Sequence, residues 1–287
     1  MRTVARSTAL IPLALFAIPL VIRPAGSLCA QAHRPQAPGI TDNSFMIEEA
    51  YNQEPGVVQH ISSFHRSLRD QEWIYTFTQE WPLRGQQHQF SFTLPIHHVA
   101  MGENAGATGV GDIGLNYRYQ LLDASARVAA AARLSLLLPT GNERRSLGNG
   151  GWGIQGNLPV SIVLSSRLVT HWNAGATVTP AAKNEIGQRA ELNDFNLGAS
   201  IIWLARRTFH VLCEVSWTRT ELITGPGETR GDVEIILNPG VRWAYDFTSG
   251  LQIVPGVAIP IGLGPSRGER GLFLYLSFEH AFRRKPL

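Results

Sequence analysis

The hydrophobic pattern of the chain is that of β-strands. In residues 271–282 the apolar side chains occupy every second position but one, and Ser277, Glu279 and Ala281 fall between them. A spacing of two is the period of a strand, whose successive side chains point to opposite faces. A stretch of about ten residues with one apolar face, ending in the aromatic Phe282, is typical of a strand that crosses a membrane in a barrel.

The same period recurs through most of the chain. We expect strands at residues 57–66, 72–81, 87–98, 109–122, 126–138, 152–164, 168–179, 192–204, 208–220, 232–245, 250–262 and 270–282. Single-chain bacterial barrels have an even number of strands. The pattern therefore predicts an all-β fold, a transmembrane antiparallel β-barrel of about twelve strands and of the outer-membrane type.

The connections between these segments alternate in length. Short ones are expected at 82–86, 123–125, 165–167, 205–207 and 246–249, and longer polar ones at 99–108, 139–151, 180–191 and 221–231. Outer-membrane barrels have short periplasmic turns and longer outer loops, whereas a soluble β-sandwich does not require this alternation. We therefore expect both chain termini on the periplasmic side.

One face of the predicted strands is polar and would line the lumen. The candidates for permeation on it are Arg118, Arg127, Arg133, Glu214, Glu234, Arg242 and Glu279. Several guanidinium groups in a narrow lumen repel one another unless carboxylates lie between them. We expect arginine–carboxylate pairs that reach across the barrel, with Asp194, Glu214, Glu234 and Glu279 as the acids. Such pairs would either select solutes or neutralise charge in a filled interior.

The opposite face is apolar and carries all seven tryptophans. Aromatic side chains near strand ends mark the two membrane interfaces. The residues expected there are Trp73, Trp81, Trp152, Trp203, Trp217, Trp243, Tyr245 and Phe282. Proline lacks the N–H that a strand ladder uses, so we expect bulges or strand ends at Pro159, Pro239, Pro255 and Pro260.

The N-terminus has the pattern of an export signal. Arg2 and Arg6 precede an apolar run at 9–22, and Ala30 and Ala32 provide the small residues of a cleavage site before His33. We expect residues 1–32 to be a signal peptide. Its removal takes three arginines and no acid, so the formal charge falls from +3 to zero. It also takes Cys29 and leaves Cys213 unpaired, so no intrachain disulfide can form.

The predicted mature chain divides into three parts. Residues 33–56 form a periplasmic lead-in or plug segment, 57–282 the barrel, and 283–287 a short basic tail. Within the first part, the spacing of Ile47, Ala50 and Tyr51 allows a short helix over 44–53, but an extended lead-in fits equally well.

Motifs of catalysis and cofactor binding are missing from the sequence. His97 and His98 are neighbours on a strand and point to opposite faces, so they cannot chelate one metal ion together. The glycine-rich stretch 148–153 lacks the lysine of a phosphate loop, and no Gly-x-Ser-x-Gly elbow occurs. No basic recognition module indicates nucleic acid. We expect no cofactor, no metal and no enzymatic activity.

Three stretches resemble a known family. They are Ile47-Glu-Glu-Ala-Tyr-Asn-Gln-Glu-Pro-Gly-Val-Val-Gln-His60, Thr108-Gly-Val-Gly-Asp-Ile-Gly-Leu-Asn-Tyr-Arg-Tyr119 and Leu138-Pro-Thr-Gly141. They are similar to an outer-membrane barrel family named for the meta-pathway of phenol degradation. The resemblance implies an outer-membrane location and the passage of small aromatic or other apolar compounds. It implies no catalytic residues.

The function that these observations favour is passive transport of a small molecule across the bacterial outer membrane. The expected partners are outer-membrane lipid, an unidentified small-molecule solute and the barrel-assembly machinery. Two alternatives stay open. One is a closed structural or anchoring barrel without transport, and the other is an outer-membrane lipid hydrolase in which His98 would face the lipid.

Overall fold

The computed structural model describes residue 40 and residues 42–100, 106–124 and 126–281. The expected signal peptide, Phe282 and the tail 283–287 lie outside the described residues. The strands are β1 (Val57–Ser67), β2 (Trp73–Pro82), β3 (His88–Ala100), β4 (Gly106–Val110), β5 (Ile113–Leu122), β6 (Val128–Leu138), β7 (Gly153–Ser165), β8 (Leu168–Lys183), β9 (Arg189–Arg206), β10 (Phe209–Gly225), β11 (Glu228–Trp243), β12 (Tyr245–Asp246), β13 (Gln252–Ala258), β14 (Ile261–Gly262) and β15 (Gly271–Ala281). Two short 3-10 helices, Glu143–Arg145 and Gly264–Ser266, lie in connections.

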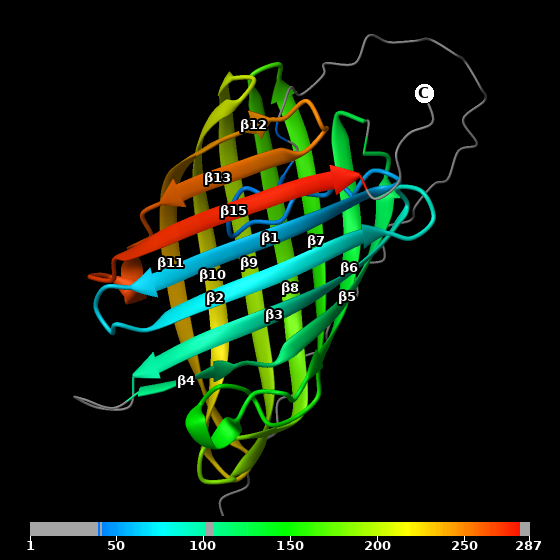
Figure 1. Cartoon of the computed structure of the whole chain (residues 1–287). Coiled ribbons are helices and arrows are strands. Elements are labelled where there is room, and N and C mark those ends of the chain that lie inside the picture. The colour runs from blue at the N-terminus through cyan, green and yellow to red at the C-terminus, as the bar shows by residue number, and fades with distance from the viewer. Residues whose placement is uncertain (1–39, 41, 101–105, 125, 282–287) are drawn as a thin grey trace, which may run out of the picture. The chain divides into compact units, whose positions relative to one another are not determined.

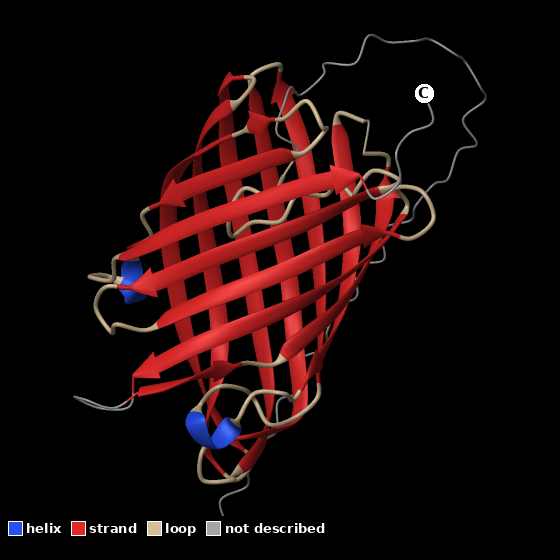
Figure 2. Cartoon of the chain, in the orientation of Figure 1, coloured by secondary structure: helices blue, strands red, loops and turns tan. Residues whose placement is uncertain are grey.

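These strands form a closed antiparallel β-barrel (Figure 1, Figure 2). The barrel closes where β1 pairs with β15 along its whole length, from Val57 opposite Ala281 to Ser67 opposite Gly271. The fifteen strands make twelve crossings because three of the twelve are interrupted. Both β4 and β5 pair with β3, both β13 and β14 pair with β11, and β12 continues β11 along β13. The predicted fold is thus confirmed.

The two ends of the barrel differ. We call the end where β1 begins and β15 ends the inner end, and the opposite end the outer end. At the inner end tight turns join β7 to β8 and β9 to β10. At the outer end residues 139–152 form a longer loop, as predicted. The predictions of long loops at 180–191 and 221–231 are wrong. Strands β8 to β11 continue through most of 180–191 and 221–231, because strand-forming residues extend there, and the β10–β11 turn contains only Pro226 and Gly227.

The two faces of the wall have the polarity of a membrane barrel. On β15 the outward side chains Leu272, Leu274 and Leu276 are exposed, while Tyr275 and Ser277 between them are buried in the lumen. The described lumen face is rich in buried polar side chains, among them Gln59, Gln89, Asn116, Ser135, Ser161, Asn238 and Arg242. This inversion of the usual burial pattern is expected where lipid, and not water, surrounds the wall.

The prolines interrupt the ladder in different ways. Pro260 lies between β13 and β14, as expected for a strand end. Pro159, Pro239 and Pro255 lie inside strands, and the ladder is broken on one side of each. For example, the β6–β7 pairing skips from Val160 to Asn157. Each proline therefore keeps its partner on one side only, so a closed barrel tolerates the missing N–H.

Among the described residues, no helix is long and apolar enough to cross a membrane.

The closed ring predicts resistance to detergent. Because β1 and β15 complete the backbone pairing, the barrel has no free edge at which unfolding can begin. The unheated protein should run on an SDS gel as a compact species, and heating should shift the band. A band that is identical with and without heating would contradict a closed barrel.

Candidate functional site: the lumen and its inner segment

A segment that precedes β1 lies inside the barrel. We call residues 42–56 the inner segment; Figure 1 shows it in blue behind β13 and β15. It follows the inside of the wall from β10 to β3, and its backbone N–H groups donate to side chains of successive strands. The bonds are Glu48 to Asn173, Ala50 to Ser161, Asn52 to Gln120 and Gln53 to Gln89, at 2.7–3.0 Å. Of the two alternatives for 44–53, a short helix and an extended lead-in, the structure has no helix, because wall side chains take up the N–H groups that a helix would use internally.

Glu214 of β10 holds the first part of this segment. Its Oε1 accepts the backbone N–H groups of Phe45, Met46 and Ile47 at 2.8, 3.0 and 3.1 Å. Its Oε2 accepts the Nδ2 of Asn238 at 2.8 Å. Consecutive backbone N–H groups that converge on one oxygen form a typical anion-binding nest. Glu214 is therefore an anchor for the segment in the described state.

The segment begins at a second anchor. Asp42 is buried, and its carboxylate accepts the Tyr275 hydroxyl at 2.6 Å, the Gln59 amide at 2.9 Å and the Ser277 hydroxyl. Arg242 of β11 donates to the Asp42 carbonyl at 2.9 Å and to the Asn43 carbonyl. The first turn of the segment is thus tied to β1, β11 and β15 together.

Arg118 of β5 holds the last part of the segment. Its guanidinium donates to the Asn52 Oδ1 at 2.8 Å and to the Tyr51 carbonyl at 2.6 Å, and it lies 3.7 Å from Glu80 of β2. Gln120 on the same strand donates to the Ala50 carbonyl at 2.6 Å. The carbonyl groups of the segment therefore have partners as well as its N–H groups.

Two apolar side chains of the segment fit against glycines of the wall. A Cβ on Gly198 would lie 2.2 Å from the Ile47 Cδ1, and a Cβ on Gly256 would lie 2.5 Å from the ring of Phe45. Gly240 would meet the same ring at 2.6 Å. Any side chain at these three positions would occupy the space that the segment now fills. The wall is thus shaped to seat the segment.

Aliphatic side chains close the lumen further near the inner end. They come from β7 to β10 and join Phe45 in one buried cluster: Val163, Val169, Ile202, Leu204 and Leu212. The Phe45 ring also packs on Phe273 and Tyr275, with centroids 5.5 and 5.4 Å apart. In the described state the inner half of the barrel is therefore a packed core and not a water-filled tube.

The outer half of the lumen contains a cavity of about 300 Å³. Hydroxyl groups of β1 to β3 line one side, and Phe45 and Glu48 of the inner segment form part of its lining. Arg133 of β6 pairs with Glu48 at 2.7 Å and donates to Gln155 at 2.9 Å and to Asn116 at 3.3 Å. Its guanidinium is thus occupied by the barrel itself.

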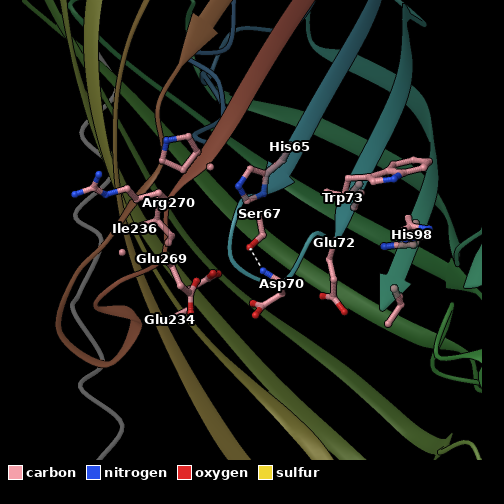
Figure 3. Close-up of a pocket in the computed structure, with 16 residues that line it drawn as sticks. His65, Ser67, Asp70, Glu72, Trp73, His98, Glu234, Ile236, Glu269 and Arg270 are labelled. Carbon is pink, nitrogen blue, oxygen red and sulfur yellow. Dashed lines mark hydrogen bonds between the residues drawn. The ribbon is translucent and has the colours of Figure 1, made fainter. Parts of the chain in front are cut away.

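Two further cavities open at the outer end. One of about 260 Å³ is lined by His65, Trp73, Glu234 and Glu269 among others, with Ser67 accepting the Asp70 N–H at 3.2 Å (Figure 3). The other, of about 550 Å³, is lined by residues of the loop 139–152 and of the β8–β9 turn. A solute that approaches from the outer end would meet these cavities before the lumen.

In the structure, several of the predicted permeation residues contact other parts of the chain. Arg118, Glu214 and Arg242 lie in the lumen and hold the inner segment, as described above. Glu279 lies on the lumen face of β15 opposite Gln59, and Glu234 lines an outer cavity. Arg127 was predicted on the lumen face of a strand. It instead precedes β6, is exposed, and donates to the Val163 carbonyl at 3.1 Å. Whether any of these residues sets permeation stays a prediction.

The expected cross-barrel pairs are wrong in their partners. Arg118 and Arg133 are directly opposite each other on β5 and β6. Each pairs with a different carboxylate, Arg118 with Glu80 and Arg133 with Glu48. Among the ion pairs of the described residues, none involves the expected acids Asp194, Glu214, Glu234 or Glu279. The acid that pairs with Arg133 comes from the inner segment, whose place in the lumen a strand pattern cannot reveal.

The aromatic side chains are distributed broadly as expected. Trp73 and Trp152 lie at the outer end, and Trp81, Trp203, Trp243 and Tyr245 near the inner end. Trp217 lies at the middle of β10 and borders an outward groove shared with Trp172, because β10 continues beyond its expected end. That these residues mark membrane interfaces stays a prediction, and Phe282 is not among the described residues.

The histidines contact other side chains. His98 shares a 2.8 Å hydrogen bond with Thr108 and stacks on Trp73, and these two contacts hold its ring. His171 bonds Ser161 at 2.7 Å beneath the inner segment. Within the described residues no group of three or more His, Cys, Asp or Glu side chains could hold a metal ion.

Comparison with known proteins shows similarity in structure only. An outer-membrane channel from Pseudomonas putida F1 matches with a TM-score of 0.61 at 15% identity, over 85% of this chain and 100% of that one. The chain has the fold of an outer-membrane channel. The KdgM porin matches at a TM-score of 0.48 with 8% identity, covering 78% and 99% of the two chains, and the CymD monoaromatic hydrocarbon channel at 0.45 with 11%, covering 81% and 90%. Only the first likeness is close enough to establish the fold.

No protein-family model matches the sequence, and no curated protein matches it. The fold agrees with the barrel that the motif resemblance implies, while the family name itself rests on those motifs alone.

Glu49 of the inner segment is buried, and it is not on a membrane-spanning strand. Burial and the neighbouring carboxylate of Asp42 raise the pKa of Glu49 well above its usual value, although Arg118 and Arg242 oppose this and Glu279 adds to it. Burial also raises the pKa of Asp42. The seated segment therefore favours protonated carboxyl groups at these two positions.

The close contact between Ile47 and Gly198 predicts a compensating pair of substitutions. Gly198→Ala should loosen the inner segment by overpacking and cost about 1–3 kcal/mol of stability. Ile47→Ala removes the atom that clashes, so the double variant should be more stable than the sum of the two single effects predicts. Thermal unfolding of the four proteins measures this, and strict additivity would show that Ile47 does not contact Gly198.

The raised pKa of Glu49 predicts a pH dependence of defined sign. A group whose folded-state pKa is raised stabilises the fold below its unfolded pKa, and this contribution is lost as the pH rises through the folded pKa. Protease cleavage within 42–56 should therefore speed up with rising pH, and less so in Glu49→Gln. An equal pH dependence in the two proteins would exclude Glu49 as its source.

Proposed function

We propose that this protein is a channel of the bacterial outer membrane that passes small molecules without energy coupling, and that the inner segment closes it in the described state. The observation that carries the proposal is a barrel of outer-membrane channel fold whose lumen is filled by a segment of its own chain. The segment is not a strand of the wall, so it can leave without breaking the backbone ladder of the barrel.

The outer-membrane location is part of this proposal. The inverted polarity of the wall and the predicted export signal support it, and both imply lipid contact and delivery by the barrel-assembly machinery. The chain then needs no cofactor, because passive diffusion is driven by the solute gradient.

The solute that we propose is small and partly apolar. The motif resemblance indicates aromatic or apolar compounds. The lumen cavity is lined by the apolar side chains of Phe45, Ile61 and Leu137 together with hydroxyl groups and charged side chains. At about 300 Å³ the cavity lies at the lower limit of typical ligand pockets of about 300–1,000 Å³. A larger solute would have to displace the inner segment.

A closed barrel without transport is the second candidate. The observation that favours it is the number of bonds on the inner segment, which reaches β1, β3, β5, β7, β8, β10, β11 and β15. A segment tied at so many points resists removal. A lipid hydrolase has no comparable support, because the contacts of His98 are with Thr108 and Trp73.

Loss of the Glu214 anchor separates the two candidates. Glu214→Gln removes the negative charge of the carboxylate, one oxygen of which accepts three backbone N–H groups. It thereby weakens these bonds, because hydrogen bonds to charged groups are worth about 1.5–3 kcal/mol and those to neutral groups less. In planar bilayers the wild-type protein should show rare or small conductance steps, and Glu214→Gln should conduct more often.

The matched control is Glu228→Gln, an exposed acid near the β10–β11 turn that is remote from the segment. Silence of the Glu214 variant, in protein that still shows the heat-dependent band shift, would contradict a displaceable closure and favour the closed barrel. A parallel phospholipase assay tests the remaining alternative.

A further inference from the structure

The wall of the barrel is interrupted between β4 and β5, at Gly111 and Asp112. The opposite residue of β3 is Pro95, which has no N–H to donate, and the Gly111 N–H donates to its carbonyl at 2.9 Å. A Cβ on Gly111 would lie 2.4 Å from the His97 ring, so the chain passes very close to β3 here. The interruption directs the Asp112 side chain away from the ladder.

Asp112 binds the outer loop 139–152 with both carboxylate oxygens. Its Oδ1 accepts the Gly141 N–H at 2.9 Å, and its Oδ2 accepts the Asn149 N–H at 2.7 Å. Thr140 completes the contact, because its hydroxyl donates to the Gly111 carbonyl at 2.7 Å and accepts the Ile113 N–H at 3.0 Å. The two sides of the strand interruption are thus bound to both ends of the loop.

The loop approaches this site so closely that only glycine fits. A Cβ on Gly148 would lie 2.4 Å from the Asp112 Oδ1, and a Cβ on Gly141 would lie 2.3 Å from the Leu147 carbonyl oxygen. Leu147 itself is only 4% exposed, and its Cδ1 would meet a Cβ on Gly109 at 2.8 Å. The loop is therefore packed onto the wall and does not extend freely into solvent.

The other side of the loop is tied to the β8–β9 hairpin. The Lys183 N–H donates to the Asn149 carbonyl at 2.8 Å, and the Ser146 hydroxyl donates to Glu185. The Asn149 carbonyl therefore accepts a hydrogen bond from the hairpin, and the Asn149 N–H donates one to Asp112. The loop bridges the rim from the β4–β5 interruption to β8.

Asp112 also lies at the junction of two cavities. It lines the lumen cavity that ends on the inner segment, and it lines the outer cavity formed by the loop and the β8–β9 turn. A solute that moves from the outer cavity into the lumen cavity would pass this carboxylate. The same residue thus holds the loop and borders both cavities.

We propose that Asp112 is a positioning residue that clasps the loop 139–152 over the junction of these two cavities, and that release of the clasp opens the lumen to solutes from the outer end. The clasp is the contact between Asp112 and Gly111 on the wall and Thr140, Gly141 and Asn149 on the loop. The access role rests on the proposed function, whereas the clasp itself does not. It acts at the outer end and is independent of the inner segment.

Two rates measured on the same variants test this proposal. Trypsin cleavage after the exposed Arg144 and Arg145, identified by mass spectrometry, reports whether the loop is held. Reaction of Ser63→Cys with a membrane-impermeant thiol reagent, in a Cys213→Ala background, reports access to the lumen cavity that Ser63 lines. Neither readout requires the protein to conduct.

Asp112→Ala removes both acceptors, and both rates should rise on the order of tenfold or more, because two charge-assisted bonds are lost. Asp112→Asn keeps one acceptor and should give smaller increases. Thr140→Val leaves Asp112 in place and should also raise both rates. It provides the test if Asp112→Ala does not fold. Asp232→Asn, an exposed acid on β11 at the same end, is the matched control and should change neither rate.

Unchanged cleavage in all three clasp variants would overturn the clasp. Faster cleavage with unchanged labelling of Ser63→Cys would overturn its role in access, and faster labelling with unchanged cleavage would show that the loop is not the barrier. If wild-type and Glu214→Gln proteins never conduct, the proposed function fails while the two rates still decide the clasp.

Discussion

Buried backbone N–H and C=O groups of the inner segment are the constraint on which the rest of the lumen depends. Such groups must find partners away from water. A segment that forms neither helix nor strand has to take them from side chains. The wall provides them from strand after strand, including the carboxylate of Glu214 and the guanidinium of Arg118. Many of the polar side chains on the lumen face therefore bind the inner segment.

Because of this constraint, charged side chains of the lumen bind the protein itself in the described state. A row of arginines in an open barrel would attract anions, but Arg118, Arg133 and Arg242 are all occupied by protein atoms. Similar logic applies at the outer end, where Asp112 is occupied by backbone N–H groups of a loop. Two of the three stretches that carry the family resemblance, around Gly111–Asp112 and Thr140–Gly141, bind each other there. Their pattern is explained by that contact.

Sequence periodicity was sufficient to predict the barrel, because the two faces of each strand can be read from alternating residues of that strand. The alternation of Leu272, Leu274 and Leu276 with Tyr275 is an example. It was insufficient for the inner segment, whose apolar side chains at Phe45 and Ile47 follow no regular period and match glycines more than 150 residues away. It also ended β8 and β10 too early and began β9 and β11 too late, since these strands continue into the polar stretches 180–191 and 221–231. Ion-pair partners require three-dimensional neighbours and were not predictable.

The inner segment can close the barrel only if it is bound in the lumen of the folded protein. Amide hydrogen exchange of the folded barrel, followed by mass spectrometry of peptides that cover 45–53, measures this directly. We predict protection similar to that of the β1 and β15 peptides, because the N–H groups of this segment are buried and hydrogen bonded. Exchange as fast as in an unstructured peptide would show that the segment is not bound there and that the lumen is open.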